Sequence, residues 1–337
     1  MKRVKYYDLL RVVCFAFIIF YHLMSQLKSN GIYSPEVLAP FYKNVNMHIA
    51  MLAVAVFFML SGAGLTINQN DDFSILDFYK KRFVRILIPF YIATIIYYIV
   101  YFAINHSFWF SGVPKWRVVF TVMGMDEWVS MHGVTTFSSG IGEWFLGALI
   151  IMYLLYPLFR FLINKYPYLL FVIATCVYIV VVYNYTWDNP PIHMCFIAKT
   201  YEFIIGMYLG KYLKYPSKKL MLISIPVCVF FFTSSIPLNI NDGLKITIFA
   251  VAFFISFSYF EPLFKDKDYK VLTFLSGFSY YIFLVHHVII YILTPKIIPY
   301  MTNIFSVIGM FAFQIVVMVI FAFIVKLLSK LVGMFLK

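Results

Sequence analysis

Long runs of apolar residues, separated by short polar segments, repeat along the whole chain. Each run is about 17–25 residues long, the length that an α-helix needs to cross the hydrocarbon core of a bilayer. Helices are expected because only they and closed barrels satisfy every backbone hydrogen bond in lipid. The pattern predicts an all-α integral membrane bundle of about ten transmembrane helices, at residues 7–26, 46–67, 84–104, 141–163, 168–185, 197–213, 219–236, 243–260, 271–293 and 304–328.

The distribution of Lys and Arg predicts how these helices are oriented. About nineteen of the 27 Lys and Arg residues fall at the termini and in the even-numbered loops, and about six in the odd-numbered loops. Since cytoplasmic loops carry the excess of positive charge, both termini are predicted to be cytoplasmic. The first run is expected to be retained, because Asp8 and Arg11 interrupt it in a way that a cleaved signal peptide would not show. The longest loop, 105–140, then lies outside, with Trp109, Trp116 and Trp128 suited to the interface.

Composition excludes a soluble globule and several classes of site. Hydrophobic residues make up 63% of the chain and charged residues 12%, against about 45–50% and 25% in soluble domains. The net charge of +13 is explained by orientation and by anionic lipid, so no nucleic-acid partner is expected. The four cysteines form no CxxC pair, and no zinc pattern or Gly-rich phosphate loop occurs, so no metal is expected.

Two ionisable residues of the first span share one helix face. Arg11 and His22 are separated by about three full turns, which places their side chains on the same side, roughly 16 Å apart along the axis. Asp8 precedes Arg11 by three positions and is expected to orient it. Ionisable residues at membrane depth favour a functional role. The alternatives are that Arg11 reaches lipid headgroups and that His22 only bonds a neighbouring helix.

Other acids and bases are expected toward the outer half of the bundle. Glu143 begins the fourth span, Lys199 and Glu202 begin the sixth, and the pair His286-His287 lies near the level of His22. Adjacent helical residues point about 100° apart, so only one of the two histidines is expected to face a cavity.

The inner side carries arginines instead. Arg82 and Arg85 lie one turn apart at the start of the third span, at the same side as Arg11. Guanidinium groups at a membrane rim suit phosphate groups, either of a nucleotide-like cofactor or of lipid. Spacing alone favours neither.

Several blocks in order along most of the chain carry a family resemblance. They are Tyr7-Asp8-Leu9-Leu10-Arg11 with His22; Phe57-Phe58-Met59-Leu60-Ser61-Gly62; Lys81-Arg82-Phe83-Val84-Arg85 with Pro89; Trp144-Phe145-Leu146 with Tyr153 and Pro157; Glu202-Phe203 with Gly206-Met207; and Ser279-Tyr280-Tyr281-Ile282-Phe283-Leu284-Val285-His286. Together they resemble the membrane acyltransferase family 3.

The resemblance implies a multi-pass enzyme of a bacterial inner or plasma membrane. Such an enzyme transfers an acyl group other than an amino-acyl group, usually acetyl, from cytoplasmic acyl-coenzyme A to a hydroxyl of a surface glycan or lipid-linked precursor. Acetyl-coenzyme A, or another short acyl-coenzyme A such as the succinyl thioester, is then the donor. The expected partners are the glycan or glycolipid acceptor and the lipid bilayer, and a homodimer is left open.

Roles follow from the same resemblance. Arg11, Arg82 and Arg85 are expected to hold the coenzyme A phosphates, and His22 to act as general base, with a covalent acyl-histidine as an alternative. Glu143 and Asp8 are assigned to the catalytic group as orienting residues. The residues assigned to acceptor binding are His286, Trp144, Glu202 and Lys199.

Larger relatives append a soluble catalytic domain, which is not expected here because Lys337 follows the last span directly. Residues 1–337 are therefore predicted to form a single membrane domain that completes the transfer itself or hands over to a separate partner. Two alternatives belong to other classes: a transporter or flippase of a lipid-linked saccharide or acyl donor, and a membrane sensor or scaffold. The flippase predicts helix-breaking Gly/Pro pairs in matching halves, which are not evident.

Overall fold

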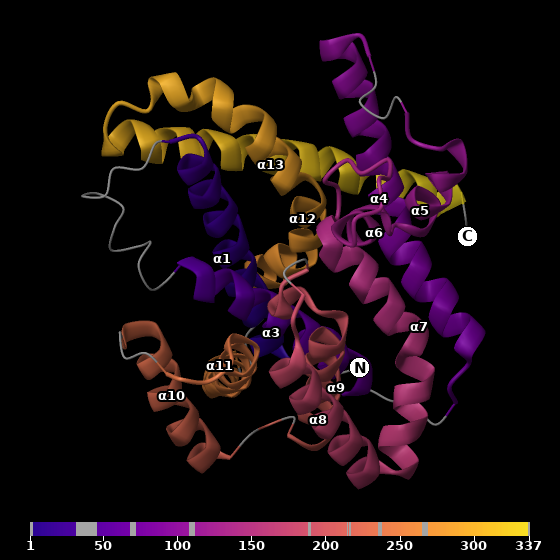
Figure 1. Cartoon of the computed structure of the whole chain (residues 1–337), viewed down its shortest axis with the longest axis vertical. Helices are drawn as coiled ribbons and strands as arrows, with labels where there is room; N and C mark the ends of the chain where they lie inside the picture. The colour runs from indigo at the N-terminus through magenta and orange to yellow at the C-terminus, as the bar shows by residue number, and fades with distance from the viewer. Residues whose placement is uncertain are drawn as a thin grey trace. The chain divides into compact units, whose positions relative to one another are not determined.

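The computed structural model describes residues 3–31, 46–67, 72–107, 112–187, 190–213, 215, 217–234, 238–264 and 269–335, so Trp109 lies outside the described residues. Within these ranges the secondary structure is helical, without a β-strand. Ten long helices follow one another there (Figure 1): α1 Lys5–Ser29, α3 Asn46–Thr66, α4 Ile75–Asn105, α7 Glu143–Lys165, α8 Pro167–Asn184, α9 Phe196–Tyr212, α10 Lys218–Thr233, α11 Asp242–Phe257, α12 Lys270–Ile297 and α13 Ile304–Phe335. Short helices are α5 Val118–Met123 and α6 Asp126–Met131, with 3-10 turns at Lys115–Arg117, Ile192–Met194, Ser258–Phe264 and Ile298–Tyr300.

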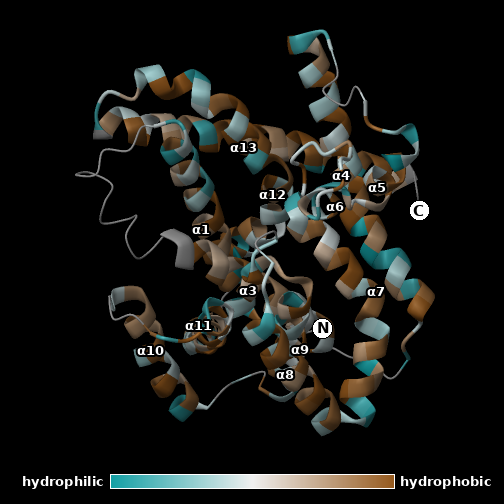
Figure 2. Ribbon diagram, in the orientation of Figure 1, coloured by the Kyte–Doolittle hydropathy of each residue, from teal (hydrophilic) through white to brown (hydrophobic). Residues whose placement is uncertain are grey.

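The prediction of an all-α membrane bundle is confirmed. In the part of the chain that the structure describes, eight helices are long and apolar enough to cross a membrane. Hydrophobic residues dominate along the long helices, as Figure 2 shows. Helices α9 and α10 overlap the sixth and seventh predicted spans, but with 17 and 16 residues they are not among these eight. The count of ten spans and the cytoplasmic placement of both termini stay predictions.

Helix α4 begins earlier than its predicted span. The Ser74 side chain accepts a hydrogen bond from the backbone N–H of Asp77 at 3.2 Å, which caps the helix before the apolar run begins. The added turns carry Arg82, so this arginine lies within the same helix as Arg85.

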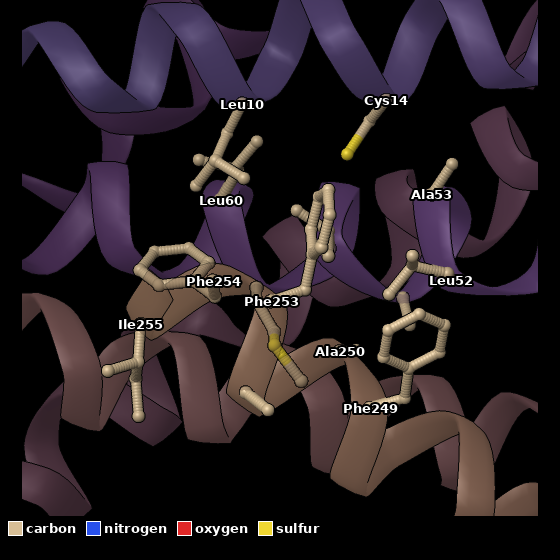
Figure 3. Packing of buried hydrophobic residues seen from close by; sticks show 14 of the residues in the cluster. Leu10, Cys14, Leu52, Ala53, Leu60, Phe249, Ala250, Phe253, Phe254 and Ile255 are labelled. Atoms are coloured by element: carbon tan, nitrogen blue, oxygen red, sulfur yellow. The ribbon is translucent and has the colours of Figure 1, made fainter. Parts of the chain in front are cut away.

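The chain forms two compact units, and each is described by itself. Unit 1 comprises Met1–Tyr21, Leu38–Phe73 and Leu154–Gly277, and unit 2 comprises His22–Val37, Ser74–Tyr153 and Phe278–Lys337. The core of unit 1 is built by α1, α3 and α11. Figure 3 shows residues from these three helices meeting there, among them Leu10, Leu60 and Phe254.

Helices α3 and α9 of unit 1 pack backbone against backbone. A Cβ atom on Gly62 of α3 would overlap the carbonyl oxygen of Phe203, and one on Gly206 of α9 would overlap that of Met59. Small residues at such a crossing let two helices approach closely, which is a common way to join helices in lipid. The two glycines therefore set the distance between α3 and α9.

Unit 2 joins α4, α12 and α13 by polar contacts among apolar surfaces. The Tyr280 hydroxyl of α12 donates a hydrogen bond to the Ile86 carbonyl of α4 at 2.9 Å. Thr294 of α12 donates to the Gln314 side chain of α13 at 3.2 Å, and α13 also packs along α4. On α7, Phe145 packs edge-on against Phe283 of α12, with ring centroids 5.5 Å apart. These contacts hold the first turn of α7 beside the middle of α12.

Candidate active site

Three histidines and one glutamate meet within unit 2. Nε2 of His22 lies 3.4 Å from Oε1 of Glu143, and Nε2 of His286 lies 3.2 Å from the same oxygen. The His22 ring centroid lies 5.2 Å from that of His286 and 4.9 Å from that of His287. Both neighbouring histidines, and not only one, therefore lie beside His22.

The two histidines of α12, His286 and His287, contact different neighbouring groups. Nδ1 of His286 donates a hydrogen bond to the carbonyl of Phe283 at 2.7 Å. A carbonyl oxygen only accepts, so this bond places the hydrogen on Nδ1 and directs Nε2 toward Glu143. His287 instead lies against the loop that precedes α7, where a Cβ atom on Gly140 would come within 3.3 Å of its Nδ1.

Glu143 stands at an unusual point of the backbone. It is the first residue of α7 and has a φ of 46°, after Gly140 at 75° and Gly142 at 80°. A non-glycine residue in the left-handed region is strained, and such residues cluster at functional sites. The turn aims the Glu143 carboxylate at the histidines.

The arrangement suits proton transfer. His22 is mostly enclosed, with 17% of its side chain exposed, and Glu143 has 15% exposed. A carboxylate at this distance stabilises the imidazolium that forms when His22 takes up a proton, because little water screens the pair. The site can therefore hold a proton taken from a bound hydroxyl.

The same residues also have the spacing of a metal site. Ligand atoms of His22, Glu143 and His287 all lie within 4.8 Å of one another. Two imidazoles and a carboxylate form the ligand set of some catalytic zinc sites. The sequence-based expectation of no metal stays a prediction.

Arg82 also lies in unit 2. Its guanidinium stacks over the rings of Phe78 and Tyr153, 5.9 and 5.8 Å from their centroids. Tyr153 follows Glu143 on α7 by ten residues, which corresponds to about 15 Å along the helix. Arg85 is exposed on the next turn of α4. Trp144, half-buried, follows Glu143 in the first turn of α7.

Arg11 and Asp8 make their contacts in unit 1. The Asp8 carboxylate is buried and accepts hydrogen bonds from Arg3 at 2.6 and 2.8 Å and from Ser276 at 2.7 Å. Arg11 lies 3.4 Å from Asp8 and donates to the Ser276 hydroxyl at 2.9 Å. Asp8 thus holds two guanidinium groups, and the predicted orienting of Arg11 has a geometric basis in these contacts.

Lys199 and Glu202 form a buried pair in unit 1. Each is 1% exposed, and the Lys199 ammonium donates to both carboxylate oxygens, at 2.8 and 2.9 Å. Thr247 donates to Glu202 at 3.4 Å. The pair binds itself, and its predicted contact with an acceptor stays a prediction.

The comparisons with known proteins decide the family. A family model described as an acyltransferase domain matches residues 4–327, nearly the whole chain. The chain belongs to acyltransferase family 3. No curated protein and no solved structure gives a significant match. The predicted family is confirmed, and the acyltransferase is a multi-pass membrane protein.

Two residues of the acyltransferase were missed by the analysis of the sequence. Ser276 of α12 contacts Asp8 and Arg11, although 268 and 265 positions of sequence separate it from them. Glu127 of α6 binds the loop that leads to Glu143, through Ser138 and Gly140. The one signal for Glu127 was an acidic pair, Asp126-Glu127, inside a loop assigned to the membrane interface.

Proposed function

We propose that the acyltransferase moves a short acyl group, in the first instance acetyl, from coenzyme A to a hydroxyl of a surface glycan or of its lipid-linked precursor. The observation that carries this proposal is the position of His22, whose Nε2 lies 3.4 Å from the Glu143 carboxylate in an enclosed cluster. A histidine held this way is suited to act as general base.

The transfer needs one proton acceptor and one leaving group. His22 takes the proton of the acceptor hydroxyl as its oxygen attacks the thioester carbonyl carbon. A new ester C–O bond forms, the thioester C–S bond breaks, and coenzyme A leaves as a thiolate. The thiolate then takes the proton that His22 held, directly or through water. Glu143 stabilises the cationic His22 between these two proton transfers.

The donor is proposed to bind at the side of the arginines. The Arg82 guanidinium lies over the ring of Tyr153, which follows Glu143 by about 15 Å along α7, so phosphates and thioester would be separated by a long arm, as in coenzyme A. Arg11 of unit 1, which contacts Asp8 and Ser276, was assigned to the same phosphates from the sequence, and that assignment stays a prediction. Guanidinium groups bind phosphate through charge-assisted, paired hydrogen bonds. Lys and Arg are in excess at the termini and in the even-numbered loops. This excess supports a cytoplasmic position for the end of the protein that carries the arginines.

The acceptor is proposed to enter from the opposite side, where Trp144 and the histidines lie. An indole and several imidazoles suit a sugar, because aromatic faces pack on its apolar C–H surface while ring nitrogens bond its hydroxyls. A glycan exposed at, or destined for, the outside of a bacterial inner or plasma membrane would meet the enzyme there.

The test is acyl transfer by the purified protein in liposomes, with radiolabelled acetyl-coenzyme A and glycolipid extracted from a bacterial lysate. The variants are His22→Ala and, as a matched control, His106→Asn, which changes an exposed histidine at the end of α4. We expect label in glycolipid with the wild type and the control. His22→Ala should lose on the order of 10²–10⁴-fold in rate.

Two further measurements separate the alternatives. The metal content of the active protein tests whether His22, Glu143 and His287 bind a metal ion. A stoichiometric ion that is lost in His22→Ala would make His22 a ligand and not the base. Binding of coenzyme A is followed by thermal shift. If no variant transfers label and coenzyme A does not bind, acyl transfer from coenzyme A is wrong, and transport of a lipid-linked saccharide should be tested instead.

A further inference from the structure

The segment from Ser138 to Gly142 places two parts of the histidine cluster. Its Gly140 lies against His287, and the next residue after the segment is Glu143. Three of its backbone positions, counting Glu143, have positive φ. Such a backbone lacks the regular hydrogen bonds of a helix and keeps its form only when its surroundings hold it.

Glu127 of α6 supplies that hold. Its Oε1 accepts one hydrogen bond from the Ser138 hydroxyl and another from the Gly140 backbone N–H. The carboxylate therefore binds the segment at two points, on either side of Ser139. Charge-assisted hydrogen bonds of this kind are stronger than neutral ones.

The environment of Glu127 agrees with a dedicated contact. Burial raises the pKa of its carboxyl, and the bonds from Ser138 and Gly140 oppose that rise. Within the described ranges no Lys or Arg forms an ion pair with it. A carboxylate that is enclosed and without a basic partner is costly, and its two donors from the segment compensate part of that cost.

Helix α6 is itself fixed in unit 2. A Cβ atom on Gly147 of α7 would come within 2.5 Å of the Trp128 Cβ, so α6 packs closely on α7. Thr136 donates a hydrogen bond to the Asp126 carbonyl at 3.2 Å, and Tyr98 of α4 donates to the Phe137 carbonyl at 3.0 Å. Glu127 therefore binds the segment from a rigid support.

We propose that Glu127 is a positioning residue, which holds the segment Ser138–Gly142 so that Glu143 faces His22 and His286 while Gly140 supports His287. Its effect on catalysis rests on the proposed function, whereas its effect on the segment does not. Glu127→Gln keeps an oxygen that accepts from Ser138 and Gly140, and Glu127→Ala removes it. Asp126→Asn is the matched control, because the Asp126 side chain does not bind the segment.

The first measurement is hydrogen–deuterium exchange of the segment in the full-length protein in lipid nanodiscs. We expect Glu127→Ala to raise exchange at the Gly140 amide at least tenfold, while Glu127→Gln and Asp126→Asn stay within about threefold of the wild type. Unchanged exchange in Glu127→Ala would overturn the proposal. If Glu127→Ala does not fold, Ser138→Ala removes one of the two bonds and should raise exchange by a smaller factor; no change there would equally overturn it.

The second measurement is acyl transfer, which separates positioning from a general loss of structure. A displacement of Glu143 should lower kcat about 10–10²-fold and leave the KM for acyl-coenzyme A within about threefold, with most of kcat restored in Glu127→Gln. A loss that Gln does not restore, or one confined to KM, would contradict positioning of Glu143. If the wild type transfers nothing, the proposed function fails, and the exchange experiment still decides the role of Glu127.

Discussion

Nε2 of His286 lies 3.2 Å from the Oε1 atom of Glu143. Nδ1 of the same ring donates a hydrogen bond to the Phe283 carbonyl at 2.7 Å. His286 is fully buried. Its ring therefore has one orientation, with Nε2 directed at the Glu143 carboxylate. Oε1 of Glu143 faces His22 as well as His286. The contact with His286 therefore links the roles of His22 and Glu143.

A double-mutant cycle tests whether His22 and Glu143 act as a unit. We expect His22→Ala to lower kcat about 10²–10⁴-fold and Glu143→Gln to lower it about 10–10²-fold, as loss of an orienting partner typically does. The double variant should be no slower than His22→Ala alone, because Glu143 acts through His22. Rates of acyl transfer at saturating donor measure this, and multiplication of the two single losses would contradict it.

Asp8→Asn tests the contacts of Arg11. The change removes the charge that holds Arg3 and Arg11, while Ser276 still accepts from Arg11. We expect the KM for acyl-coenzyme A to rise about tenfold, the size of one lost charge-assisted contact, with kcat nearly unchanged. Initial rates across donor concentrations measure both constants. Asp77→Asn, in an exposed first turn of α4, is the control, and an equal rise in KM there would argue against a specific role.

Two glycines of α3 form a matched pair for stability. Gly62→Ala places a methyl group into the Phe203 carbonyl of α9, whereas Gly64→Ala, two positions along, meets open space. We expect Gly62→Ala to lower the thermal midpoint strongly, since overpacking costs about 1–3 kcal/mol or more, and Gly64→Ala to leave it unchanged or slightly raised. Thermal unfolding in detergent measures this. Equal midpoints for the two variants would contradict the close helix crossing.

Asp126 predicts a pH dependence of stability. Burial raises the pKa of its carboxyl from 3.8 to about 6, so between these values the folded state binds more protons than the unfolded state. Stability then falls as pH rises through about 6, by at most about 3 kcal/mol at pH 7. Asp126→Asn should raise the thermal midpoint at pH 7 and flatten its change between pH 5 and 7. Asp242→Asn, at an exposed carboxylate, should not.

The helices were predictable because membrane thickness imposes a length and an apolar composition on each segment. Depth along the helices also brought His22, Glu143 and His286 to one level. The start of α4 was placed too late, because its first turns are polar and depend on the Ser74 cap. Hydropathy alone does not register such a cap.

The finer geometry of the site was not predictable for a different reason. The bond from His286 to Phe283 and those from Glu127 to Ser138 and Gly140 depend on side-chain direction and loop conformation. Ser276 reaches Arg11 across most of the sequence. Neither kind of contact leaves a periodic signal, so only the folded chain reveals it.

The left-handed backbone of Glu143 has a consequence for how this position evolves. Glycine would adopt a φ of 46° without strain, so selection for folding alone would favour glycine here. Under the proposed function, the strain of a glutamate at this point is offset by the carboxylate that it places beside the histidines. Members of the lineage that lose the reaction should drift to Gly or Asn at this position before their apolar cores change.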